Sequence, residues 1–71
     1  MTRSIESDMA AGVWQVSVAV GDIVREGDVL MVLESMKMEI PIESPVDGTV
    51  ESIAVAAGDA VVTGQELAVI S

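Results

Sequence analysis

The sequence predicts an all-β fold, a sandwich or flattened barrel made of two similar halves. Valine and isoleucine supply 19 of the 71 residues and occur in short runs separated by glycine, which favours strands over helices. A repeated motif divides the chain in two. Because a β unit of this size cannot bury a hydrophobic face alone, we expect the halves to pack on one another with approximate two-fold symmetry.

The individual strands are predicted from apolar runs bounded by turn residues. We expect longer strands at residues 13–18, 29–34, 39–43, 49–55 and 66–70, and short ones at 23–24 and 60–62. The pattern Thr63-Gly64-Gln65-Glu66 resembles a helix-capping box, but the glycine and the nearby chain end indicate a turn. Proline lacks a backbone donor, so Pro41 predicts that its strand lies at a sheet edge.

The repeat is the clearest architectural signal. The segments VGDIVREGDVLMVL and AGDAVVTGQELAVI align at a constant offset of 37 residues, and Val13 and Val50 keep the same offset. Alternation predicts that Leu30 and Val32, with their repeat partners, line the shared core. Met31 and Leu33 are then expected on the opposite face, and the single tryptophan, Trp14, is expected to be the main bulky packing residue.

Turn chemistry explains the residues between these runs. Asp22 and Asp59 each follow a turn glycine, so we interpret them as turn-forming residues and not as a catalytic carboxylate pair. Five glycines fall between apolar runs, where a turn can require positive φ. They are Gly21, Gly27, Gly48, Gly58 and Gly64.

Composition excludes several functions. A formal charge of −9 argues against binding nucleic acid, and the absence of cysteine and histidine removes disulfides, the usual zinc ligand sets and most catalytic nucleophiles and bases. The apolar runs are too short to span a bilayer, and the first ten residues do not resemble a signal peptide. We therefore expect a cytoplasmic, non-catalytic protein that is a monomer in isolation and binds neither metal nor membrane.

One residue carries distinctive chemistry. Lys37 is the only lysine, and Met36 and Met38 flank it at the join between the two halves. That position predicts the tip of a hairpin.

The segments ESMKMEIPI and SPVDGTV, together with the two Gly-Asp repeats, resemble the biotinyl/lipoyl attachment family, of the biotin carboxyl carrier type. The resemblance runs from about residue 11 to residue 71 and implies a barrel-sandwich hybrid of two four-stranded antiparallel sheets. It indicates a single domain, 1–71, with repeat halves at about 11–36 and 38–71 joined by Lys37. The chain looks like a free-standing biotinylated carrier or an excised domain.

The resemblance also implies the site and its partners. A biotin protein ligase would attach biotin covalently to Lys37, with Met36 and Met38 fitting the ligase. The carrier would then shuttle carboxybiotin between a biotin carboxylase and a carboxyltransferase. Glu34 and Glu39 are candidates for orienting Lys37 or meeting the ligase, although in so acidic a chain a solvated surface is the simpler explanation for them.

Two alternatives remain at this point. A lipoyl domain has a similar lysine hairpin, but that family usually places Asp before and Ala or Val after the lysine. The other alternative is an unmodified β-sandwich that serves as an interaction module, which would leave the Met-Lys-Met sequence unexplained.

Overall fold

Eight β-strands and no helix make up the computed structural model, which describes residues 2–71. The strands are β1 (Arg3–Glu6), β2 (Ala11–Val16), β3 (Ile23–Val24), β4 (Val29–Ser35), β5 (Met38–Glu43), β6 (Gly48–Ile53), β7 (Ala60–Val61) and β8 (Glu66–Ile70). The all-β prediction is confirmed, and each predicted strand lies within two residues of an observed one. Strand β1 was not predicted.

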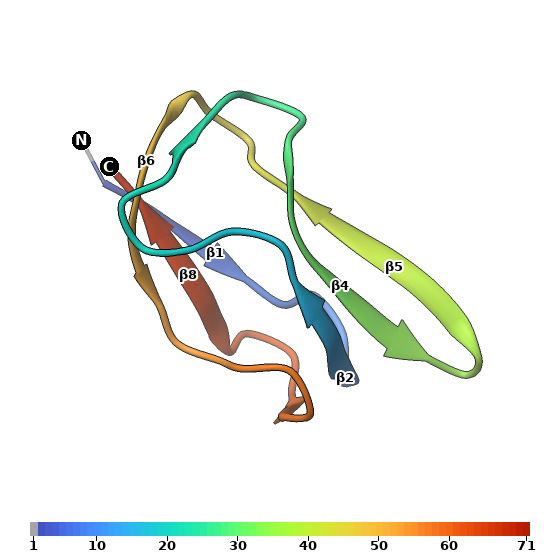
Figure 1. The fold of residues 1–71 in the computed structure, drawn as a ribbon. Helices are drawn as coiled ribbons and strands as arrows, with labels where there is room; N and C mark the ends of the chain where they lie inside the picture. Colours follow the sequence, from blue (N-terminus) through green and yellow to red (C-terminus); the bar gives the residue numbers. More distant parts are fainter. Residues whose placement is uncertain (1) are drawn as a thin grey trace.

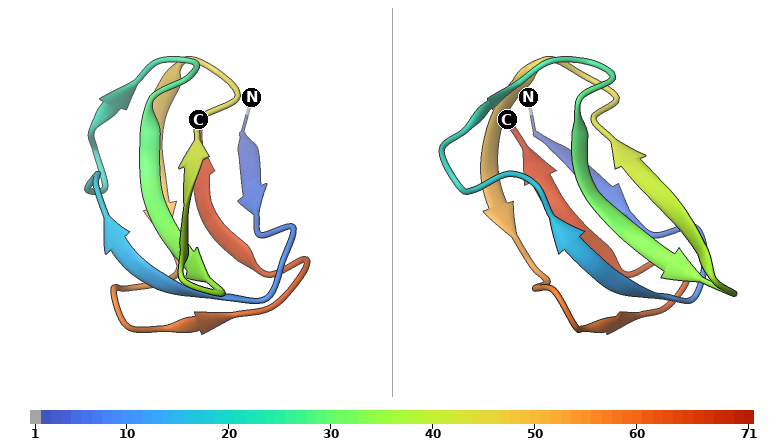
Figure 2. Two further views of the ribbon diagram at one scale, coloured as in Figure 1. Left: turned by 90° about the vertical axis from the view of Figure 1, so that its right-hand side faces the viewer. Right: turned by 45° about the vertical axis from the view of Figure 1, so that its right-hand side comes forward.

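The strands form two four-stranded antiparallel sheets that face one another (Figures 1 and 2). The order is β1-β8-β6-β3 in one sheet and β5-β4-β2-β7 in the other. β5 pairs only with β4, so Pro41 lies on an edge strand as predicted. Within residues 2–71, no helix is long and apolar enough to cross a membrane.

Hydrogen bonds reproduce the repeat of the sequence. The Gly21 N–H donates to the Val50 carbonyl at 2.8 Å, and 37 residues later the Gly58 N–H donates to the Val13 carbonyl at 2.8 Å. Each half therefore closes a turn of the other half, which is the contact pattern of a pseudo-two-fold axis.

The symmetry also explains the strand that was missed. Ile5-Glu6-Ser7 is identical to Ile42-Glu43-Ser44 at the same offset of 37, and β1 pairs with β8 as β5 pairs with β4. The Ser7 hydroxyl donates to the Met9 carbonyl and the Ser44 hydroxyl donates to the Val46 carbonyl, both at 2.6 Å. The first repeat thus begins before residue 11.

The alternation predicted for β4 is right for Leu30, which is buried, but wrong for Val32, which is not. Val29 lies opposite Glu43 and Met31 opposite Ile42, so Leu30 is an extra residue in a β-bulge. The bulge lets Leu30, Met31 and Leu33 all be fully buried, whereas Val32 is only half-buried. In β8, Leu67 is the corresponding extra residue opposite β1, with Leu67 and Ala68 buried and Val69 half-buried.

Two apolar clusters form the core, and the pseudo-two-fold axis exchanges most of their members. The first cluster contains Val13, Met31, Leu33, Val55, Val61, Leu67 and Ala68. The second contains Ile5, Val24, Leu30, Val50 and Ile70. Each cluster draws side chains from both halves of the chain, so neither half has a core of its own.

Trp14 does not fill this core. Val13 lies opposite Leu33 and Gln15 lies opposite Val32, so Trp14 is an extra residue in a β-bulge. Its side chain is 52% exposed, while its neighbour Val13 is buried. The prediction that Trp14 is the main packing residue is therefore wrong, and aliphatic side chains build the core.

The glycines follow the prediction with one exception. Gly21, Gly27, Gly58 and Gly64 have φ between 85° and 96°. Gly48 does not adopt positive φ; a Cβ there would collide with the Ser71 carbonyl oxygen and lie 2.8 Å from Ile70 Cγ2. Close packing against the C-terminal strand, and not turn geometry, requires glycine at this position.

Candidate functional site

Lys37 lies at the tip of the hairpin formed by β4 and β5. Ser35 and Met38 are the last paired residues, so only Met36 and Lys37 make the turn. Both have positive φ, 52° at Met36 and 64° at Lys37. Two left-handed central residues are the signature of a type I′ turn, the two-residue turn that matches the twist of antiparallel strands.

The turn sequence is unusual for this geometry. Type I′ turns favour Asn-Gly or Asp-Gly because other residues resist left-handed φ, at about 1–2 kcal/mol per residue. Met36 and Lys37 are the only non-glycine residues with positive φ between residues 2 and 71. A turn that retains two unfavourable residues points to a demand on their side chains that folding does not explain.

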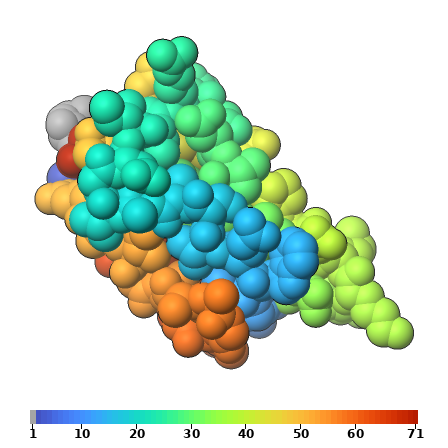
Figure 3. All heavy atoms as spheres, viewed as in Figure 1, coloured from blue at the N-terminus to red at the C-terminus, as the bar shows by residue number. Residues whose placement is uncertain are grey.

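The tip projects into solvent. Met36 is 93% exposed and Met38 is 65% exposed, while Lys37 is also exposed. The molecule measures 33 × 18 × 17 Å, and the hairpin forms one end of its elongated outline (Figures 1 and 3). Both methionines therefore lie outside the core, and the side chain of Lys37 is open to a large partner.

The acidic candidates lie below the tip. Glu34 and Glu39 are directly opposite one another across β4 and β5, and both are exposed. Their face is the outer one, because the next pair, Leu33 and Ile40, belongs to or packs on the first core cluster. Two carboxylates therefore stand near Lys37 on one side of the hairpin.

Asp22 and Asp59 lie in turns, as expected. The Ala19 N–H donates to Asp22 Oδ2 and the Ala56 N–H donates to Asp59 Oδ2, each at 2.9 Å. Both side chains thus cap the turns that contain Gly21 and Gly58. No group of three or more potential metal ligands occurs within residues 2–71.

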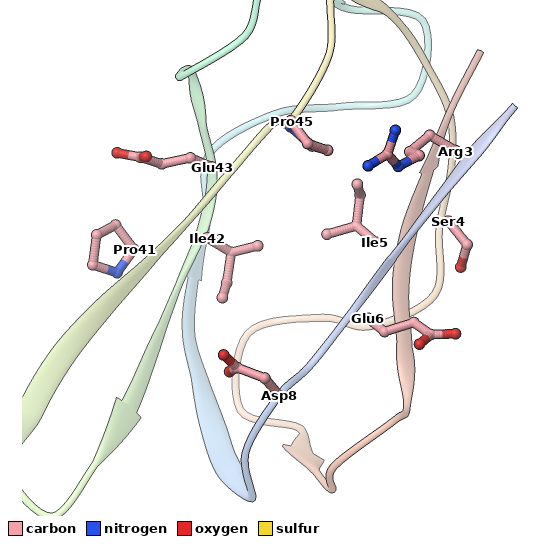
Figure 4. A pocket seen from close by; sticks show the side chains of 9 residues that line it. All are labelled: Arg3, Ser4, Ile5, Glu6, Asp8, Pro41, Ile42, Glu43 and Pro45. Atoms are coloured by element: carbon pink, nitrogen blue, oxygen red, sulfur yellow. The ribbon is translucent and has the colours of Figure 1, made fainter.

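A groove of about 320 Å³ opens elsewhere, between edge strands β1 and β5 (Figure 4). Ile5 and Ile42, which are repeat partners, contribute its apolar wall, and Arg3, Glu6 and Glu43 surround them. Residues 34–40 do not line it. The groove and the lysine tip are therefore separate features.

The comparisons with known proteins agree with this geometry. The sequence profile of the biotin/lipoyl family, described as "Biotin-requiring enzyme", matches residues 4–70. The chain belongs to the biotin/lipoyl attachment family. The match includes most of β1, which precedes the resemblance expected from about residue 11.

Individual relatives show two settings for this domain. A Mycobacterium leprae protein named biotinylated protein TB7.3 homolog is 44% identical over 71 residues, all of both chains. A Bacillus subtilis biotin/lipoyl attachment protein is 43% identical over 67 residues, covering 94% of this chain and 89% of that protein. The crystal structure of Kluyveromyces lactis urea carboxylase matches with a TM-score of 0.93 and 32% identity, covering this whole chain but only 6% of the carboxylase.

This membership confirms the predicted family, the biotin cofactor and the biotin carrier role. The family consists of carrier domains, in keeping with a supporting part in carboxylation. Lys37 occupies the hairpin turn where the sequence predicts it. The left-handed conformation of Met36 and Lys37 was not predicted; a two-residue spacing between paired strands indicates it.

Proposed function

We propose that Lys37 is the biotin acceptor of this protein. The observation that carries the proposal is the hairpin tip: the only lysine of the chain occupies an exposed two-residue turn with a left-handed backbone. In attachment, the Lys37 amine attacks the activated carboxyl group of biotinyl-adenylate. An amide bond forms, AMP leaves, and the positive charge of the lysine is lost.

The chain itself supplies position and reach. The paired strands β4 and β5 hold the base of the tip, and the long lysine side chain extends from a turn that no other segment covers. When attached, biotin supplies the ring nitrogen that accepts and releases a carboxyl group. The protein delivers that ring to a biotin carboxylase and then to a carboxyltransferase.

Met36 and Met38 are proposed to contact the biotin protein ligase. Their side chains are exposed apolar groups on both sides of the acceptor, and flexible thioethers adapt well to a partner surface. Glu34 and Glu39 are proposed to meet the same partner from the outer face of the hairpin. We further propose that the protein acts in the cytoplasm as a monomer with no catalytic residues of its own.

The attachment step is tested by intact mass. The purified protein and Lys37→Arg are incubated with biotin, ATP and a biotin protein ligase. We expect the native sequence to gain one biotinyl group and the folded variant to gain none. If the folded native protein gains no biotin but accepts lipoate from a lipoyl ligase, the lipoyl alternative replaces this proposal.

The carrier step is tested separately. Biotinylated protein is incubated with a biotin carboxylase, ATP and labelled bicarbonate, and the label on the protein is measured after rapid desalting. We expect acid-labile label only on the biotinylated form. Biotinylated protein that acquires no label would contradict a role in carboxyl transfer while leaving the attachment site intact.

A further inference from the structure

The sulfur atoms of this protein are distributed very unevenly. Met36 is 93% exposed and Met38 is 65% exposed, whereas Met31 is fully buried and Met9 is half-buried. The chain has no cysteine, so no thiol competes for oxidants. Because oxidation of sulfur follows its exposure, the two most accessible thioethers of residues 2–71 are the neighbours of Lys37.

We propose that Met36 and Met38 form a redox-sensitive modification site that controls the attachment of biotin to Lys37. The oxidants are of the peroxide class. The inference rests on the proposed function of Lys37 as the acceptor.

The chemistry of the modification is a two-electron oxygen transfer. A sulfur lone pair attacks the outer oxygen of a hydroperoxide, an S–O bond forms, and the O–O bond breaks. Sulfur is oxidised to the sulfoxide, and the peroxide is reduced to water or an alcohol after the proton has moved to the leaving oxygen. A methionine sulfoxide reductase reverses the change.

Met36 and Met38 lie where oxidation can alter ligase binding without disturbing the folded core. Oxidation turns a flexible apolar side chain into a polar, chiral one. Met36 lies in the turn and Met38 is the first residue of β5, and neither belongs to the two core clusters. Met31 does belong to the first core cluster. Oxidation at the tip therefore changes the surface offered to the ligase and leaves the sandwich folded.

The structure also predicts an order of oxidation. Exposure falls from Met36 to Met38, then to half-buried Met9, and finally to Met31. The Lys37 amine between the two tip sulfurs stays unmodified. A limited dose of oxidant consequently produces a protein that retains its acceptor lysine but presents it between two sulfoxides.

The experiment uses the full chain without biotin. The protein is treated with graded hydrogen peroxide, the peroxide is removed, and oxidation is located by peptide mass mapping. The initial rate of biotinylation is then measured with untreated ligase, biotin and ATP, alongside the thermal unfolding midpoint. We expect at least a tenfold fall in rate when Met36 and Met38 are oxidised, an unchanged midpoint, and recovery after treatment with both stereospecific sulfoxide reductases.

Matched variants identify the responsible sulfurs. Each variant is compared with itself before and after peroxide. In the double variant Met36→Leu with Met38→Leu, the biotinylation rates before and after peroxide should be nearly equal. Met9→Leu should lose as much rate as the native sequence.

Two results would overturn the inference. Equal rates for reduced and tip-oxidised protein would reject it while leaving Lys37 as the acceptor. Loss of rate that persists in the double leucine variant would assign the effect to another group. Failure of the untreated, folded protein to accept biotin would reject the proposed function and this inference together.

Discussion

The backbone conformation of Met36 and Lys37 costs folding free energy. Each residue has left-handed φ, which costs about 1–2 kcal/mol for a side chain with a Cβ. Asparagine tolerates this conformation better because its short polar side chain bonds locally. The cost at the tip is therefore measurable by substitution.

We expect Met36→Asn to raise the free energy of unfolding by up to about 1 kcal/mol, because asparagine favours the first central position of a type I′ turn. Chemical denaturation measures the change. The matched control is Met38→Asn, whose position is an exposed strand residue without positive φ and should gain nothing, since asparagine is disfavoured in strands. A loss of stability in Met36→Asn as large as in the control would contradict the assigned strain.

Gly48 shows the opposite situation, a residue that must lack a side chain. An added Cβ would meet the Ser71 carbonyl oxygen and Ile70 Cγ2, and overpacking of this kind costs roughly 1–3 kcal/mol. We expect Gly48→Ala to lower the unfolding midpoint strongly. Gly12→Ala is the control, because its Cβ would have only ordinary contacts at 3.9 Å and 4.0 Å. Equal effects of the two substitutions would contradict the close approach seen at Gly48.

At the scale of elements, the hairpin of β4 and β5 carries charge that folding does not need. Glu34 and Glu39 are directly opposite one another, and like charges in this arrangement destabilise a sheet. The pair lies on the outer face of the hairpin, next to the turn formed by Met36 and Lys37. We infer that the hairpin is adapted to partners as well as to folding.

Removing one of these charges should stabilise the protein. We expect Glu39→Gln to raise the free energy of unfolding by several tenths of a kcal/mol at low salt, and the gain to shrink as salt increases. The control is Glu51→Gln, which removes the same charge from an exposed position on β6. If Glu51→Gln gives the same gain, the effect reflects net charge and not the pair.

Element by element, the sequence predicts much of this fold but not its irregularities. Apolar runs and glycines locate seven strands, and the 37-residue repeat identifies the two halves. The bulges at Leu30 and Trp14 depend on the register between strands, which alternation within one strand does not contain. That is why the inner face of β4 and the exposure of Trp14 were predicted wrongly. β1 was detectable from the repeated Ile-Glu-Ser, but it is short and precedes the longer repeat.

At the scale of the whole molecule, both halves of the chain contribute residues to each core cluster. Leu30 and Leu67 are repeat partners, both fully buried, and they belong to different clusters. Since each cluster contains residues from both halves, unfolding of one half should also unfold the other half. The two halves thus share one core, from which the hairpin of β4 and β5 extends (Figure 1).

We expect Leu30→Ala and Leu67→Ala each to cost about 2–5 kcal/mol, with one cooperative transition in both variants. Fluorescence of Trp14 reports on the sheet that contains β2, and far-ultraviolet circular dichroism reports on all strands. Val62→Ala, at a 61% exposed position, should change little. Two separate transitions in either leucine variant would contradict a shared core.

The hairpin that carries Lys37 lies away from the paired ends of β1 and β8 (Figure 1). β1 begins and β8 ends side by side, where Arg3 pairs with Ile70, and this end of the sandwich lies away from the lysine hairpin (Figure 1). Similar sequences make up the whole of the M. leprae biotinylated protein and 6% of the K. lactis urea carboxylase chain.

The proposed carrier role depends on attachment of biotin to Lys37 at the hairpin tip. The most direct measurement is peptide mapping of the biotinyl group after ligase treatment of three proteins: the native sequence, Lys37→Arg, and Lys37→Arg combined with Thr63→Lys. The last variant places a lysine in a different exposed turn, without flanking methionines. We expect biotin on Lys37 of the native protein and on no residue of the two variants. Biotin on the lysine introduced by Thr63→Lys at a comparable rate, or on another residue of the native protein, would contradict it.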